Sequence, residues 1–187
     1  MENKTKGKKT KTVNIRNRFA VCFFLYLSAV FGLSFFGLSF LQSYELASEV
    51  VEQTYYSVIE LALGVSGLTL NYLLLSTLIV GVIGGLLTLT VAIICSVFKK
   101  YSPIAVMIMA FAIAALTYAF VMSLLFPAVI SASLSELPNP MSLVRTLWPI
   151  IVMSGLLGSA MIIDYGLLIY ASIDAYASSG IKHILQK

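Results

Sequence analysis

The segment Leu61–Phe98, LALGVSGLTLNYLLLSTLIVGVIGGLLTLTVAIICSVF, contains no charged residue. One straight helix over this segment would be about 57 Å long, whereas the hydrocarbon core of a bilayer is about 30 Å thick. The glycines and serine within residues 64–67 favour a break in the helix. The remaining stretch, residues 70–98, has the length and composition of a transmembrane helix, and the lysine pair at 99–100 ends it.

The composition extends this interpretation to the whole chain. Of its 187 residues, 59% are hydrophobic and only 11% are charged, whereas soluble domains carry about 25% charged residues. Because lipid offers the backbone no hydrogen-bond partner, only helices and closed barrels cross a membrane. The apolar runs are continuous and lack the alternation of a barrel strand. The sequence therefore predicts an all-α integral membrane protein.

Three further apolar segments complete a predicted bundle of four transmembrane helices, at residues 19–42, 70–98, 103–130 and 146–173. Pro127 is expected to kink or end the third helix near the membrane surface, so that residues 131–142 form a loop. Together the spans make one transmembrane domain, residues 19–176. A basic tail, residues 1–18, precedes it, and a short tail, residues 177–187, follows it.

Four glutamates interrupt the apolar sequence after the first span. Their spacing, together with Tyr56, places them on one side of a helix, and it predicts an amphipathic helix outside the membrane at about residues 44–63. This acidic face is either a binding surface for cations or a basic partner, or an ordinary solvated helix face. The glutamates are Glu45, Glu49, Glu52 and Glu60.

The basic residues predict how the chain is oriented. Seven of the 12 lysines and arginines lie within residues 1–18, and the only one expected on the opposite side is Arg145. Since positive residues remain on the cytoplasmic side, we expect both termini to be cytoplasmic. Phe19 begins an apolar run directly after the basic tail, so the tail is interpreted as an anchor at the lipid surface and not as a nucleic-acid-binding arm.

Small residues recur at four-residue spacing on every predicted span. Such rows let helix backbones approach closely, which matters in lipid because burial of apolar surface does not itself drive helices together. The candidate packing residues are Ser28, Gly32, Thr77, Gly81, Gly85, Ala115, Ala119, Gly155 and Ser159.

Asp164 is the only ionisable residue expected inside a membrane-spanning segment with apolar residues on both sides. A carboxylate at that depth costs at least about 2.5 kcal/mol, so its side chain should face protein or water. It is either a site for a proton or a cation, or a carboxyl that joins two helices through a hydrogen bond.

The sequence carries none of the motifs expected of an enzyme. It lacks GxSxG, HExxH and P-loop patterns, its single histidine, His183, lies near the C-terminus, and Cys22 and Cys95 form no CxxC pair. We therefore expect no catalysis, no cofactor and no metal site.

These observations favour an accessory or structural subunit of a membrane complex, in contact with the bilayer and with partner helices or further copies of itself. The alternative is a small oligomeric channel or transporter for protons or cations that uses Asp164.

The predicted topology can be tested by labelling single cysteines in a background without Cys22 and Cys95. Cysteines at positions 48 and 135 should react with an impermeant reagent added to intact cells, and cysteines at positions 102 and 179 should not. Labelling at position 102 would contradict the four-span arrangement.

Overall fold

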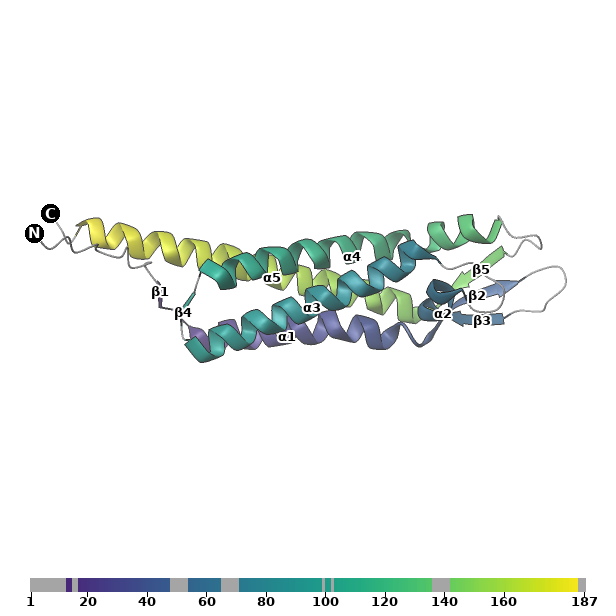
Figure 1. Ribbon diagram of the computed structural model, residues 1–187, viewed down its shortest axis with the longest axis horizontal. Helices are drawn as coiled ribbons and strands as arrows, with labels where there is room; N and C mark the ends of the chain where they lie inside the picture. The colour runs from purple at the N-terminus through teal and green to yellow at the C-terminus, as the bar shows by residue number, and fades with distance from the viewer. Residues whose placement is uncertain are drawn as a thin grey trace, which may run out of the picture.

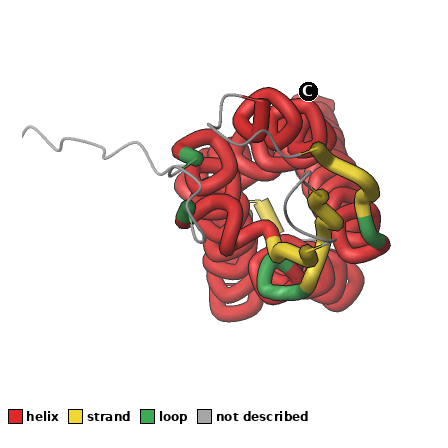
Figure 2. Tube along the Cα trace, turned by 90° about the vertical axis from the view of Figure 1, so that its right-hand side faces the viewer, coloured by secondary structure: helices red, strands yellow, loops and turns green. Residues whose placement is uncertain are grey.

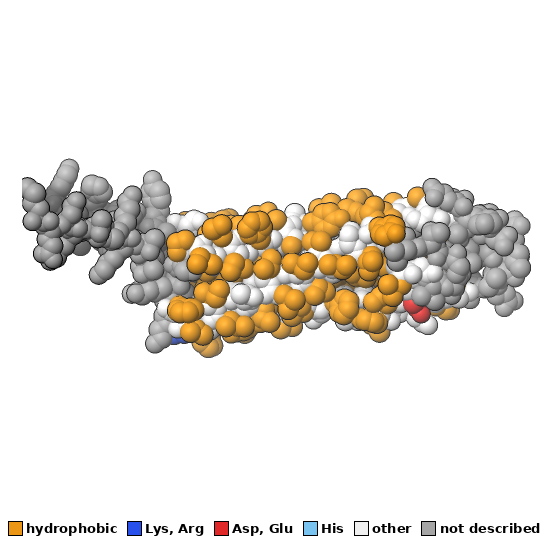
Figure 3. All heavy atoms as spheres, in the orientation of Figure 1, with side chains coloured by type: hydrophobic (Ala, Val, Ile, Leu, Met, Phe, Trp, Pro, Cys, Tyr) orange, Lys and Arg blue, Asp and Glu red, His pale blue; other side chains and the backbone are white. Residues whose placement is uncertain are grey.

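The structure is a computed structural model, and it describes residues 13–14, 17–47, 54–64, 71–98, 100–101, 103–135 and 142–184. Four long helices lie side by side in an elongated bundle (Figure 1). They are α1 (Arg18–Leu38), α3 (Tyr72–Phe98), α4 (Pro103–Ser135) and α5 (Trp148–Ile184). Each is long and apolar enough to cross a membrane, so the expectation of four spans is confirmed as far as length and composition decide it. Hydrophobic side chains cover the visible flank of the bundle (Figure 3).

The four helices form a ring. α3 packs between α1 and α4, and α5 closes the ring by packing against both α4 and α1. Consequently α3 and α5 lie diagonally opposite each other. The view along the bundle shows its helices arranged around a common axis (Figure 2). Successive helices run in opposite directions, so α1 begins and α5 ends at the same end of the bundle (Figure 1).

Several helix ends differ from the predicted boundaries, and the largest difference is in α5, which continues to Ile184 and not to residue 173. α1 ends at Leu38 and not at residue 42, because a strand begins at Gln42. α4 continues through Pro127 to Ser135, so residues 131–135 are helical and not part of a loop. A proline inside a helix removes one backbone hydrogen bond, but the side chains of Phe126, Ile130 and Leu134 are buried one turn apart on either side of it. Their packing stabilises the continued helix.

A small sheet and a short helix form a cap at the end of the bundle opposite the start of α1 (Figure 1). The cap consists of β2 (Gln42–Ala47), β3 (Thr54–Ser57), β5 (Ser142–Thr146) and α2 (Val58–Leu63). The strands pair antiparallel in the order β3-β2-β5. At the other end, β1 (Val13–Asn14) pairs with β4 (Lys100–Tyr101).

The cap corrects the prediction of an external helix over residues 44–63. Among the described residues of this range, 58–63 are helical, while 44–47 and 54–57 are strands. The run Thr54-Tyr55-Tyr56 has high strand propensity, and β2 gains a second partner in β5, about a hundred residues away in the sequence. Such long-range pairing overrides a helical spacing of charges. Residues 48–53 lie outside the described part of the chain.

The short helix α2 has well-defined ends. Ser57 and Glu60 form a capping box, in which each side chain bonds the backbone N–H of the other residue. Gly64 ends the helix with φ 74°, a left-handed conformation that glycine adopts without steric cost. The hydrogen bonds from Ser57 hold the pKa of the Glu60 carboxyl below its usual value.

The buried side chains form two apolar clusters. The larger extends from the cap into the adjoining half of the bundle, and it includes Tyr44 and Leu46 of β2 together with Phe35 of α1. The smaller lies nearer the β1–β4 end, around Val91 and Cys95 of α3. Tyr44 is fully buried in the cap, and this burial raises the pKa of its phenol.

Glycines set how closely three of the helices approach one another. A Cβ atom added to Gly85 would lie 3.1 Å from the backbone nitrogen of Leu33, and one added to Gly32 would lie 3.1 Å from the Cα of Gly85. α1 and α3 therefore cross backbone to backbone. On the other side of α3, a Cβ at Gly84 would lie 3.2 Å from the backbone nitrogen of Leu116.

Replacement of Gly85 by alanine tests this close crossing. The added methyl group meets backbone atoms, which cannot turn away, so Gly85→Ala should destabilise the protein by about 1 kcal/mol despite the better helix propensity of alanine. Gly37→Ala is the matched control, because no described atom lies within 4 Å of a Cβ at that position. Thermal unfolding in detergent measures both variants. Equal midpoints for the two would contradict the crossing.

Candidate functional site

Asp164 lies at the centre of the bundle. Its side chain is 0% exposed, and the Thr88 hydroxyl donates a hydrogen bond of 2.7 Å to its Oδ2 atom. Thr88 is on α3 and Asp164 is on α5, which are the two diagonally opposite helices. This hydrogen bond therefore crosses the interior of the bundle.

A third helix brings a further hydroxyl to the same place. Ser28 of α1 is fully buried, lies beside the Asp164 carboxyl, and donates to the backbone carbonyl oxygen of Ala160 at 3.1 Å. Thr88 also lies 3.2 Å from the carbonyl oxygen of Gly84. We call Ser28, Thr88 and Asp164 the polar layer. On each of the helices α1, α3 and α5, the residue of the polar layer lies between members of the larger cluster and members of the smaller one, so the polar layer separates the two clusters.

One atom of the polar layer has no partner. Asp164 Oδ1 is buried and accepts no hydrogen bond within the described part of the chain. A buried oxygen of a carboxyl is costly to leave unpaired, especially if the carboxyl is charged. The sequence identified Asp164 as a candidate and Ser28 only as a packing residue, and it did not identify Thr88. A sequence signal for Thr88 exists, because residue 88 follows Gly81 and Gly85 on the same helix face.

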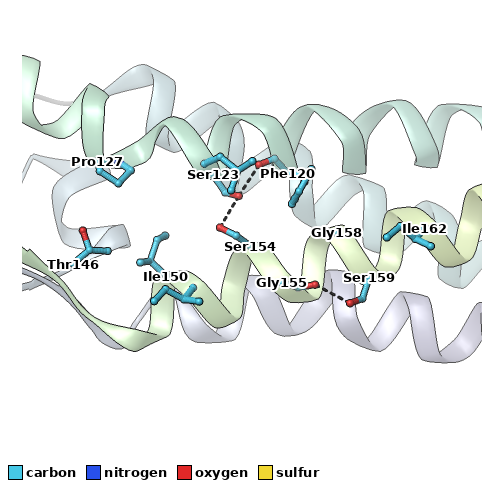
Figure 4. Close-up of a pocket in the computed structure, with 12 residues that line it drawn as sticks. Phe120, Ser123, Pro127, Thr146, Ile150, Ser154, Gly155, Gly158, Ser159 and Ile162 are labelled. Atoms are coloured by element: carbon cyan, nitrogen blue, oxygen red, sulfur yellow. Dashed lines mark hydrogen bonds between the residues drawn. The ribbon is translucent and has the colours of Figure 1, made fainter.

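A second candidate site is a groove between α4 and α5, with a volume of about 670 Å³ (Figure 4). At its base, the hydroxyls of Ser123 and Ser154 lie 2.9 Å apart and form a hydrogen bond between the two helices. Its wall on α5 includes the small residues Gly155, Gly158 and Ser159. The groove opens outward, since Gly155 and Ser159 are exposed.

The predicted packing residues divide into two groups. Those on α1 and α3 are buried where helices meet, as is Ala119 on α4, while Ala115 is half-buried. Gly155 and Ser159 on α5 differ, because they face outward. A Cβ at Gly155 would have no described atom within 4 Å. The buried residues are Ser28, Gly32, Thr77, Gly81, Gly85 and Ala119.

The predicted acidic face does not exist as one helical surface. Glu45 is buried in β2, directly opposite Arg145 of β5 in the strand register. Glu60 belongs to the capping box of α2. Glu49 and Glu52 lie outside the described residues. In that described part, no group of three His, Cys, Asp or Glu side chains is close enough to hold a metal ion.

Comparison with known proteins gives no relative to guide the assignment. No model of a protein family matches the sequence, and no significant similarity is found to a curated protein or to a solved structure. The polar layer and the groove are therefore the features from which function is inferred.

The hydrogen bond between Thr88 and Asp164 can be tested by two substitutions. Asp164→Asn keeps an oxygen that accepts from Thr88 and should leave the thermal midpoint unchanged in buffer free of alkali-metal salts. Asp164→Leu leaves the Thr88 hydroxyl without this acceptor and should cost about 1 kcal/mol, the magnitude typical of hydrogen bonds between membrane helices. If both variants are equally destabilised, the hydrogen bond between Thr88 and Asp164 does not account for the loss of stability.

Proposed function

We propose that this chain is a non-catalytic accessory subunit of a membrane complex, and that a transmembrane helix of a partner binds in the groove between α4 and α5. The observation that carries the proposal is the concave outer surface at Gly155 and Ser159, where helix α5 presents small residues that the chain's own helices do not cover. Small residues at this spacing allow close approach of another helix backbone.

The rim of the groove supports this proposal. Ile151 is 69% exposed and Ile162 is 67% exposed, and both belong to its lining. In lipid such exposure is not unfavourable by itself, so the shape of the surface matters more than its hydrophobicity. The side chains of Ile151 and Ile162 project on either side of the small residues Gly155 and Ser159. Together they form a hollow that is complementary to a ridge of side chains on a neighbouring helix.

Orientation is part of the proposal. Arg18 and Lys100 lie at the end of the bundle where α1 begins, while the cap forms the other end. Six further basic residues precede Arg18 in the sequence. By the positive-inside rule, both termini then lie on the cytoplasmic side of the membrane, and the cap lies on the opposite side.

A second candidate function is a homo-oligomeric channel or transporter for protons or cations. The observation that favours it is the unpaired Oδ1 atom of Asp164 in the middle of the bundle. Intramembrane carboxyls in such positions serve as proton or ion sites in pumps and transporters. This candidate needs a path from the polar layer to water, whereas the accessory function does not.

A substitution that fills the groove tests the proposed function. Gly155→Leu should abolish recovery of the partner when the protein is purified in mild detergent, because the new side chain occupies the floor of the groove. The matched control is Gly37→Leu, at a glycine on α1 that also has no described atom within 4 Å of its Cβ. The masses of the purified complexes provide the measurement.

Thermal midpoints of both purified variants should equal that of the wild type, which separates loss of a partner from misfolding. A wild-type protein that purifies only as a homo-oligomer and conducts ions in liposomes would contradict the accessory function and favour the second candidate.

A further inference from the structure

We propose that the polar layer is a binding site for one sodium ion, held by the Asp164 carboxylate and by the hydroxyl oxygens of Thr88 and Ser28. The proposal does not depend on the accessory function, because a bound ion that stabilises the bundle requires neither a partner nor transport.

The polar layer offers the donor atoms that such an ion takes. Hard cations bind oxygen ligands, including carboxylates, hydroxyls and backbone carbonyls. In the polar layer the carboxylate comes from α5 and the two hydroxyls come from α3 and α1. Each hydroxyl already has an acceptor for its proton, so its lone pairs remain free for an ion. The carbonyl oxygens of Gly84 and Ala160 lie within 3.2 Å of these hydroxyls.

The unpaired Oδ1 atom of Asp164 is the observation that calls for a ligand. It belongs to a side chain with no solvent exposure, and the nearby Ser28 hydroxyl donates its proton to the carbonyl oxygen of Ala160 and not to Oδ1. A cation beside Oδ1 gives that atom a partner and leaves the hydrogen bond from Thr88 to Oδ2 in place. The ion would thus give a partner to the one oxygen atom of the polar layer that the described residues leave unpaired.

Charge and size favour sodium among the cations. The polar layer contains a single carboxyl group, and the described part of the chain pairs no cation with it. One monovalent ion neutralises one carboxylate, whereas a divalent ion would leave a net positive charge at membrane depth, which is costly. One turn from Ser28 and Thr88, α1 and α3 meet backbone to backbone at Gly32 and Gly85, so the polar layer has little room, which favours sodium over the larger potassium ion.

A bound ion would act on the assembly of the bundle. Its ligands belong to α1, α3 and α5, so binding requires that all three helices are in place. A ligand that binds only the folded state raises the stability as its concentration rises. Sodium should therefore stabilise this protein specifically and saturably.

The experiment measures thermal unfolding of the full-length protein in detergent, at constant ionic strength, in sodium, potassium or N-methyl-D-glucamine chloride. We expect a midpoint that rises with the sodium concentration, with little effect of potassium. Radioactive sodium should bind with a stoichiometry of one per chain. Asp164→Asn should remove the sodium effect while retaining the midpoint that the wild type has in N-methyl-D-glucamine.

Two threonines of α3 provide matched variants. Thr88→Val should weaken sodium binding at least tenfold, and Thr88→Ser, which keeps the hydroxyl, should restore it. Thr90→Val is the control, because the Thr90 hydroxyl also donates within its own helix but is exposed on the outer face.

Three outcomes would overturn the proposal. The first is equal midpoints in the three salts, and the second is a sodium effect that persists in Asp164→Asn. The third is stabilisation by acidic pH that is independent of sodium, which would assign the carboxyl to a proton instead. None of these outcomes bears on recovery of a partner with the Gly155→Leu variant, so the two proposals fail separately.

Discussion

Lipid supplies no hydrogen-bond donors or acceptors, so each polar group within the bundle must find a partner in the protein. Isolated hydroxyls meet this requirement locally, since Thr77, Thr90 and Thr117 each donate to the carbonyl oxygen four residues earlier in their own helix. An ionised carboxylate cannot do so, because its oxygens only accept hydrogen bonds and find no free backbone N–H inside a helix. Asp164 therefore requires groups from other helices, and Thr88 of α3 supplies one of them.

The same constraint acts at the ends of the helices, where backbone groups lose their intrahelical partners. The cap provides partners by strand pairing, and it also joins distant parts of the chain. β2 and β3 lie between α1 and α3, whereas β5 lies between α4 and α5. Pairing of β2 with β5 thus ties the first pair of spanning helices to the second at this end. The apolar core of the bundle continues into the cap without interruption, so the two fold as one unit.

The sequence was sufficient for the spanning helices, because long uncharged segments have one stable form in lipid. It was insufficient for the cap, because two local signals there conflict. The spacing of the glutamates is typical of a helix, whereas Thr54-Tyr55-Tyr56 favours a strand. The strand is stabilised by pairing of β2 with β3 and with the distant β5. Asp164 was identifiable by its charge alone. Its partners were not, because a hydrogen bond between diagonal helices depends on the order of helices in the ring.

Helix α5 combines both candidate sites on opposite faces. Asp164 and Ala160 face the interior, where they meet Thr88 and Ser28, while Gly155 and Ser159 face outward into the groove. The inner face of α5 is bonded to α3 and α1. These bonds limit rotation of α5 about its own axis, because rotation would expose the Asp164 carboxyl to lipid. The outward face is consequently presented in one orientation. A partner that binds there meets a preformed surface, which reduces the ordering cost of association.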